Sequence, residues 1–402
     1  MKFSKKKIFY LLISGAILIF GLSSPPTPKV LSLPILVSGL FLILSVLMFG
    51  NIVFKLSHDL TTFSFLLFFL YFLTIPNFVG FLNGNTFNDI IRDFLSFLFL
   101  FLFILWLPII KLDTSQFLNF IVKLLIFLGL SFSIKYLVLQ DLSLVRLTYY
   151  RVSEGHFSHD PSVLFSAIYF SIEGLRLYNN NNKINSLIFS FFGLVCFLSL
   201  LLTGFRLQVF LFIFIYFFSF IIYFWFKPKI FFFYIIIFLC ILFPIHEHIS
   251  IALSNLYNKQ LNLGFNNRFK EFSVLIGEEK NYLYLIGEGW GALFSTVVNA
   301  FSPVRFVHNF SLYFFYKAGM IGLLFSIILI IFSFRVVLIP IINYLLNLKL
   351  NYSNKYYPVL IAIIPSLIYG LFFSGAFKSL SMGLLLVLVN CFYFYQKNNK
   401  VI

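Results

Sequence analysis

Residues 305–332 decide the fold class of this chain, and they read RFVHNFSLYFFYKAGMIGLLFSIILIIF. Arg305, His308 and Asn309 stand before an apolar run, and a membrane-crossing helix needs about 20 mostly apolar residues. The stretch therefore predicts a membrane helix at 307–334 that carries one internal cation, Lys317. The polar residues at its start are either an anchor at the membrane surface or part of a functional site.

The composition of the whole chain indicates a membrane protein. Among 402 residues, 61% are hydrophobic, 21% are aromatic and only 10% are charged, and the mean hydropathy is +0.99. A soluble domain carries more charge on its surface. The alternating apolar and polar pattern of a membrane β-barrel is absent. We therefore predict an all-α polytopic protein that forms a single integral membrane domain over residues 1–402.

Apolar runs separated by charges, Pro or Asn predict twelve membrane helices. Their expected limits are 8–23, 30–49, 62–80, 90–110, 117–139, 162–178, 184–203, 206–226, 230–245, 307–334, 356–373 and 376–395. The first is expected to remain as an uncleaved span, because no small-residue cleavage site precedes the prolines that follow it.

The basic residues predict how the helices are oriented. The short loops on one side carry about three times as many Lys and Arg residues as those on the other, which places both termini in the cytoplasm. The outer short loops hold only Lys29, Arg146, Arg151, Arg206 and Lys378. Orientation also explains the net charge of +16, and no nucleic-acid partner is predicted because the cations form no stripe.

One long connection, residues 246–306, is predicted to lie outside, where loops of this length are usually functional or disordered. Its sequence LIGEGWGALF places Gly287, Gly289 and Gly291 in alternation. Backbone N–H groups in such a bend can face a phosphate. Alternatively, the glycines form a turn that lets the loop re-enter the bilayer.

Three polar residues near the predicted outer surface each have a structural and a functional interpretation. Arg206 is either a helix-end anchor or a functional cation. Arg268 is either a surface charge paired with Glu271 or a ligand contact. His308 either lies at a helix start as a capping residue or acts as a general base.

No metal or other cofactor is predicted. His156, His159 and Asp160 could form a metal site, but no second ligand pair stands elsewhere at matching spacing. Asp160 before Pro161 is more typical of a helix N-cap with Pro at the first helical position. The cysteines at 196, 240 and 391 lie in apolar segments and predict no disulfide.

These features together resemble the bacterial O-antigen ligase and polymerase superfamily. The resemblance rests on the topology and on three motifs within 185–335: TGFR, then RFKEFSVLIG with YLIGEGWG, then VHNFSLYFFYKAGMIGLL. The chain departs from the family pattern at Phe205, Phe269, Phe272 and Glu288. The resemblance implies a metal-independent membrane glycosyltransferase of the GT-C type in the bacterial inner membrane.

The family resemblance also implies roles for particular residues. Arg206 and Arg268 would hold the donor pyrophosphate and stabilise it as the leaving group. His308 would accept the proton of the acceptor sugar hydroxyl or orient that hydroxyl. The implied donor is an undecaprenyl-pyrophosphate-linked oligosaccharide. A chain-length regulator is a further partner compatible with the resemblance. The additional substrate-binding candidates are Arg305, Asn309, Arg146, Arg151, Gly287 and Gly289.

Three activities are compatible with this picture. A polymerase joins lipid-linked repeat units of O-antigen or capsule, and it is the activity we favour. A ligase transfers finished chains to lipid A core and needs the same donor contacts. A lipid-linked oligosaccharide flippase also has about twelve spans, but transporters place ionisable groups near the bilayer midplane and the long outer loop fits a flippase poorly.

Overall fold

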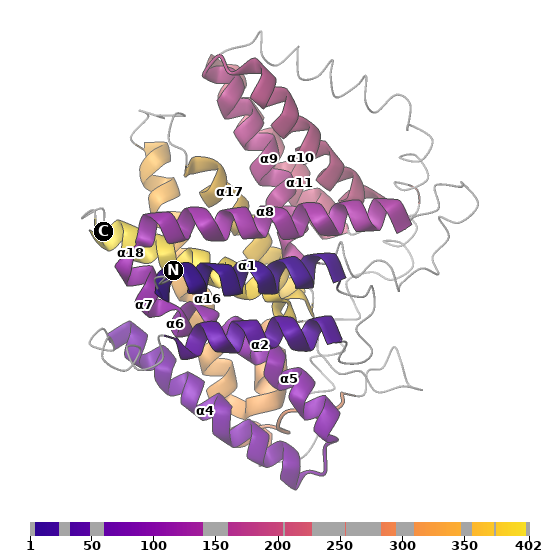
Figure 1. The fold of residues 1–402 in the computed structure, drawn as a ribbon, viewed down its shortest axis with the longest axis vertical. Coiled ribbons are helices and arrows are strands. Elements are labelled where there is room, and N and C mark those ends of the chain that lie inside the picture. The colour runs from indigo at the N-terminus through magenta and orange to yellow at the C-terminus, as the bar shows by residue number, and fades with distance from the viewer. Residues whose placement is uncertain are drawn as a thin grey trace. The chain divides into compact units, whose positions relative to one another are not determined.

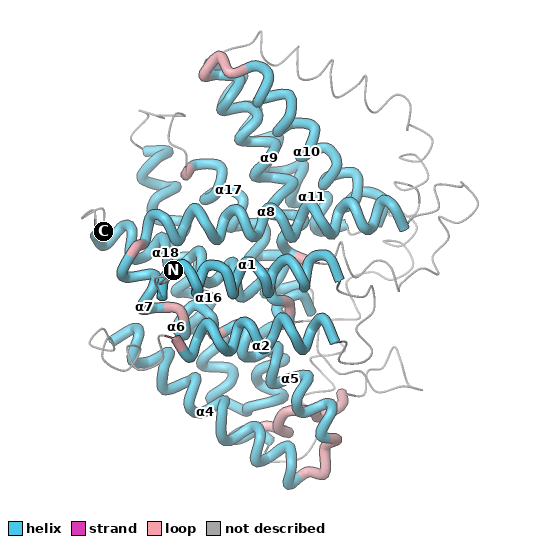
Figure 2. Tube along the Cα trace, viewed as in Figure 1, coloured by secondary structure: helices cyan, strands magenta, loops and turns pink. Residues whose placement is uncertain are grey.

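The computed structural model describes residues 5–23, 33–48, 60–139, 160–203, 206–226, 254, 283–294, 309–346, 356–373 and 375–398. Every regular element in these ranges is a helix (Figures 1 and 2). The elements are α1 (Lys5–Ser23), α2 (Leu33–Leu47), α4 (Leu60–Leu82), α5 (Phe87–Leu100), α6 (Leu102–Leu105), α7 (Leu107–Leu112), α8 (Thr114–Leu139), α9 (Pro161–Asn179), α10 (Lys183–Thr203), α11 (Arg206–Phe226), α15 (Leu283–Ile286), α16 (Phe310–Leu346), α17 (Tyr357–Ile368), η3 (Tyr369–Phe373), η4 (Gly375–Lys378) and α18 (Leu380–Asn398).

The predicted all-α membrane class is confirmed at the level of length and composition. Within the described ranges, 6 helical segments are long and apolar enough to cross a membrane. They are Lys5–Ser23, Thr62–Leu82, Thr114–Val138, Lys183–Leu202, Phe310–Ile342 and Leu380–Lys397. The count of twelve spans and the GT-C-like fold stay predictions, and the expected span at 230–245 lies outside the described residues.

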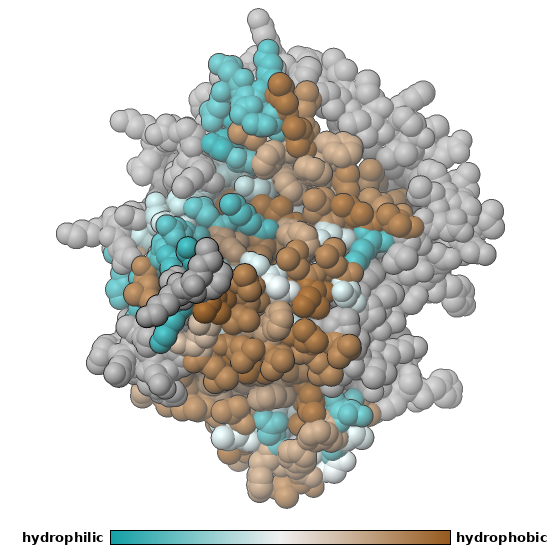
Figure 3. Space-filling model, viewed as in Figure 1, coloured by the Kyte–Doolittle hydropathy of each residue, from teal (hydrophilic) through white to brown (hydrophobic). Residues whose placement is uncertain are grey.

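Apolar side chains cover the outward face of α1, α2 and α4, as the brown surface over α1 and α2 in Figure 3 illustrates. Leu11 on α1, Leu40 on α2 and Phe78 on α4 are 68%, 53% and 63% exposed. Large apolar side chains this exposed along whole helices are unfavourable in water. They are instead suited to contact with lipid chains.

Contacts within the chain group it into two compact units. Unit 1 comprises Met1–Leu125, Phe265–Ile342 and Gly370–Ile402, and unit 2 comprises Ile126–Gly264 and Asn343–Tyr369.

In unit 2, small residues bring the helices close together. A side chain added at Gly174 on α9 would meet Ser190 Oγ of α10 at 2.5 Å, and one at Gly193 would meet Ser171 Oγ at 2.7 Å. Ser186 Oγ donates to the Gly174 carbonyl at 2.7 Å. Small residues and inter-helix hydrogen bonds of this kind drive helix association in membranes, where hydrophobic burial offers little gain.

In unit 1, the predicted span 90–110 is wrong as a single helix. Its chain forms α5, α6 and α7, with interruptions at Phe101 and Trp106. Pro108 stands in the first turn of α7, where its missing N–H costs least. Near the interruptions, Asn390 Nδ2 of α18 donates to the Phe103 carbonyl at 2.7 Å. Such a donor is needed because backbone groups have no water to pair with inside a bilayer.

The predicted span 307–334 is also not one straight helix. Gly319 in α16 has φ 64° and ψ −151°, outside the helical region. A side chain added at Gly322 would meet the Phe314 carbonyl oxygen at 2.2 Å, and the Phe310 and Phe325 rings lie 6.4 Å apart. In a straight helix, 15 residues span about 22 Å. The chain therefore folds back at Gly319.

We call residues 310–318 the half-helix. Its nine residues span roughly 13 Å, too little to cross a bilayer, whereas residues 320–346 span about 40 Å. Pro340 in this longer part lacks the N–H that would bond the Val336 carbonyl. Gln396 Nε2 of α18 donates to that carbonyl instead, at 3.1 Å.

Candidate functional site

A glycine-rich turn, residues 287–291, is built into unit 1 between α4 and α16. Trp290 is fully buried, and Gly287, Gly289 and Gly291 all have positive φ values between 74° and 84°. A side chain at Gly289 would meet the Gly80 nitrogen of α4 at 2.2 Å. One at Gly287 would meet the Ala318 nitrogen at 2.4 Å. Glycine therefore serves here both the left-handed backbone and the close approach to two helices.

Two backbone N–H groups of this turn pair with carbonyls that the fold-back in α16 leaves free. Glu288 N donates to the Tyr316 carbonyl at 2.8 Å and Gly289 N to the Lys317 carbonyl at 3.0 Å. In a continuous helix those carbonyls would accept from residues 320 and 321. The fold-back at Gly319 removes these bonds, and the glycine-rich turn supplies replacements.

Trp290 does the same for α4. Pro76 in α4 lacks the N–H that would bond the Phe72 carbonyl. Trp290 Nε1 donates to that carbonyl at 3.2 Å, and Trp290 N donates to the Pro76 carbonyl at 2.8 Å. The indole therefore fills the gap that the proline creates, and it ties the turn to the interior of α4.

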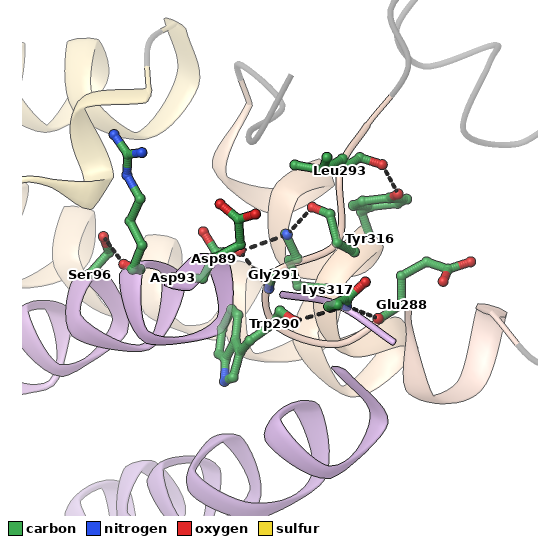
Figure 4. A network of polar contacts seen from close by, with 12 residues as sticks. Asp89, Asp93, Ser96, Glu288, Trp290, Gly291, Leu293, Tyr316 and Lys317 are labelled. Atoms are coloured by element: carbon green, nitrogen blue, oxygen red, sulfur yellow. Dashed lines mark hydrogen bonds and ion pairs between the residues drawn. The ribbon is translucent and has the colours of Figure 1, made fainter. Parts of the chain in front are cut away.

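The Asp93 carboxylate of α5 is the ionic centre of this region (Figure 4). Lys317 Nζ lies 2.7 Å from Oδ2, and Lys378 Nζ of η4 lies 2.9 Å from Oδ1. Gly291 N also donates to Oδ2, at 3.0 Å. We call Asp93, Lys317 and Lys378 the ionic cluster. One carboxylate thus joins α5, the half-helix, the glycine-rich turn and η4.

The ionic cluster is almost closed to solvent. The side chains of Lys317, Asp93 and Lys378 are 1%, 5% and 18% exposed. Lys317 Nζ donates a further hydrogen bond to the Ala292 carbonyl at 2.5 Å. Lys378 Nζ lies 4.3 Å from the centre of the Tyr313 ring, a cation–π contact. Each of the three ions therefore has direct partners, which buried ions require.

Ionisable groups inside a membrane protein are costly and are a functional-site hypothesis by default. Two roles fit this geometry. The ionic cluster can hold the glycine-rich turn and the half-helix in one register. Alternatively, it can exchange its partners during a transport cycle, since broken helices and buried charges are typical of transporters.

The structure describes only part of the site predicted from sequence. Five of the residues, Arg146, Arg151, Arg268, Arg305 and His308, lie outside the described residues. Arg206 is the first residue of α11, and the structure describes its backbone only. Asn309 Oδ1 accepts from Ser311 N at 2.9 Å and so caps the half-helix, with His308 directly before it in the chain.

Gly287 and Gly289 form a turn, and whether that turn lets the loop re-enter the bilayer stays a prediction. Every N–H from Glu288 to Gly291 donates to a protein acceptor, so these donors hold the turn against α4, α5 and α16. A phosphate would have to displace those bonds to bind there. The glycines therefore act as a packed turn in this structure.

The predicted N-cap at Asp160 is confirmed. Its Oδ1 accepts from Ser162 N at 2.9 Å, and Pro161 begins α9. His156 and His159 lie outside the described residues. Within the ranges that the structure describes, no group of three or more His, Cys, Asp or Glu residues could hold a metal ion.

The ionic cluster was not predicted from sequence as a site. Lys317 and Asp93 stand in apolar segments of the sequence. Charged residues are rare in such segments, so their presence alone marks both as candidate functional residues. The basic-residue pattern predicts that Lys378 lies in a short outer loop. Nothing in the pattern pairs Asp93 with Lys378, since 285 residues separate them.

Comparisons of the chain with protein-family models, with curated proteins and with solved structures found no match.

Proposed function

We propose that this protein is a polysaccharide polymerase of the bacterial inner membrane. It would join undecaprenyl-pyrophosphate-linked repeat units of O-antigen or capsule at the outer face, as a metal-independent glycosyltransferase. Arg206 and Arg268 would bind the donor pyrophosphate, and His308 would accept the proton of the acceptor hydroxyl. Arg305, Arg146 and Arg151 would add contacts to phosphate or sugar.

One observation supports this proposal above the others. The turn 287–291, part of the predicted outer loop, is held within unit 1 by four backbone N–H groups, one of which donates to Asp93. It contacts the half-helix, which begins directly after His308 and Asn309. A loop fixed in this way to the element that directly follows a candidate base in the sequence suits an enzyme, because catalysis needs groups held in place.

A lipid-linked oligosaccharide flippase is the second candidate. The buried ionic cluster and the interruptions in α5–α7 and α16 favour it, because transporters use broken helices and buried charges. A ligase that transfers finished chains to lipid A core is a third activity. It needs the same donor contacts as a polymerase, so only its product separates the two.

The test is the surface-glycan profile of a strain that lacks this chain, run beside its complemented parent. A polymerase predicts glycolipid that carries a single repeat unit, with the ladder restored on complementation. Bare core with lipid-linked polymer outside would replace the polymerase by a ligase. Single repeats trapped on the inner leaflet would replace it by a flippase. An unchanged profile would reject all three.

A further inference from the structure

The half-helix is too short to be stable without contacts to other parts of the protein. Helices of fewer than about 12 residues are marginal in isolation, so tertiary contacts must fix a helix of nine. At its N-terminal end, the Phe310 ring packs against Phe377 at 5.4 Å and Phe325 at 6.4 Å. These apolar contacts are non-directional and specify register only weakly.

Directional contacts lie at the other end of the half-helix. Lys317 Nζ pairs with Asp93 and also donates to the Ala292 carbonyl, while Tyr316 Oη donates to the Leu293 carbonyl at 2.8 Å. Tyr71 Oη of α4 donates to the Ala318 carbonyl at 3.1 Å. Register and rotation of the half-helix are therefore set where Lys317 meets Asp93.

We propose that Asp93 and Lys317 are positioning residues for Asn309, the substrate-binding candidate that caps the half-helix. This inference rests on the proposed polymerase function. The ion pair fixes the half-helix, and Asn309 caps the N-terminal end of the half-helix. Neither residue needs to touch the substrate for this role.

The carboxylate is required because of how its oxygens are used. Oδ2 accepts from Gly291 N and pairs with Lys317, while Oδ1 pairs with Lys378. An amide at position 93 presents one oxygen and one NH₂ group, so it cannot satisfy both ammonium groups. Loss of the charge therefore releases either the half-helix or η4.

The first experiment compares rates per folded molecule for Asp93→Asn, Lys317→Gln and the double variant. We expect kcat for chain formation to fall by roughly a hundredfold, the cost of about 1 Å of misplacement. KM for the lipid-linked donor should stay within about twofold, because the donor arginines are untouched. The double variant should be no worse than the worse single, since both remove one interaction.

The matched control is Asp113→Asn. Asp113 pairs with Lys6 in unit 1, away from the ionic cluster, and its side chain is 19% exposed. This variant removes the same charge and should leave kcat and KM unchanged. Asp93→Glu should restore part of the activity. An Asp93→Asn enzyme with full kcat overturns the inference, and a large rise in donor KM replaces it by a direct role in donor binding.

A second measurement does not depend on activity. Spin labels at Ser311→Cys on the half-helix and Phe78→Cys on α4 report the half-helix position, in a full chain whose native cysteines are replaced. We expect one narrow distance distribution in the parent and in Asp113→Asn, and a broader or shifted one in Asp93→Asn.

The two measurements separate two failures. A parent that forms no polymer but shows the Asp93-dependent distance overturns the polymerase and keeps the anchoring of the half-helix. Unchanged distances in Asp93→Asn overturn the positioning role even when activity is lost.

Discussion

Arg206, Arg268 and His308 are the side chains on which the proposed glycosyl transfer depends. Replacing each by Ala should abolish chain formation while the protein still inserts, because the donor pyrophosphate and the acceptor hydroxyl lose their partners. The measurement is the polymer ladder at matched expression. Lys183→Ala, at the exposed start of α10, is the control and should keep the ladder. Full activity in all three variants removes these residues from the site.

Individual residues also show which features can be predicted from sequence and which depend on tertiary structure. Asp160 as an N-cap followed from its own neighbours, since capping is a local interaction. The ionic cluster depends on tertiary folding. Lys317 stood out as a cation in an apolar run, but the residues that neutralise it are fixed by packing between distant helices.

The fold-back at Gly319 leads to a prediction about the stability of α16, which alanine substitutions at three glycines can test. A side chain at Gly319 would meet the Leu285 carbonyl oxygen at 2.3 Å, at a φ of 64°. Gly319→Ala should therefore lower the unfolding free energy by more than about 3 kcal/mol, since strain and a backbone clash add. Thermal unfolding in detergent measures the change.

Two other glycines separate the contributions. Gly84 has a φ of 72° but open space around it, so Gly84→Ala should cost about 1 kcal/mol. Gly39 in α2 has open space and no positive φ, so Gly39→Ala should be neutral or stabilise by up to about 1 kcal/mol. If Gly319→Ala were no worse than Gly84→Ala, the fold-back would be contradicted.

The contact between Trp290 and the proline-containing turn of α4 leads to a second prediction about stability. Trp290→Phe keeps most of the buried ring but removes the N–H that the Phe72 carbonyl accepts, and should cost about 1–3 kcal/mol. In a Pro76→Ala background the helix can supply its own N–H, so the same substitution should cost less. Equal costs in both backgrounds would show that the indole N–H does not serve the proline gap.

The half-helix could not be predicted from the apolar pattern. Residues 310–318 and 320–346 are mostly apolar, so their sequence pattern resembles one long span. Gly319 looks like any glycine in a membrane helix, where glycine is common. The break becomes visible through the glycine-rich turn, whose N–H groups donate to the carbonyls that the fold-back leaves free.

At the scale of the whole molecule, composition alone identified an all-helical membrane protein. The bias of basic residues further predicts which side each connection faces. Asn182, between α9 and α10, should face the cytoplasm, and Phe87, at the start of α5, should face outward. In intact cells, a membrane-impermeant maleimide should label Phe87→Cys and leave Asn182→Cys unlabelled until the cells are opened. The reverse pattern would invert the topology.

The number of membrane crossings cannot be derived from apolar length alone. Interruptions in α5–α7 and the fold-back in α16 show that an apolar run can be long enough to cross and still not do so as one helix. Length and hydropathy measure whether a segment tolerates lipid. They carry no information on which backbone groups a neighbouring segment will satisfy.

The hydrogen bond from Gln396 to the Val336 carbonyl has a consequence for how this sequence can diverge. A donor at position 396 is needed only while position 340 is proline, because any other residue there brings its own N–H. Among descendants of this chain, the two positions should therefore change together. A lineage that replaces Pro340 is released from keeping a glutamine 56 residues later, whereas one that loses Gln396 first carries an unpaired carbonyl inside the membrane.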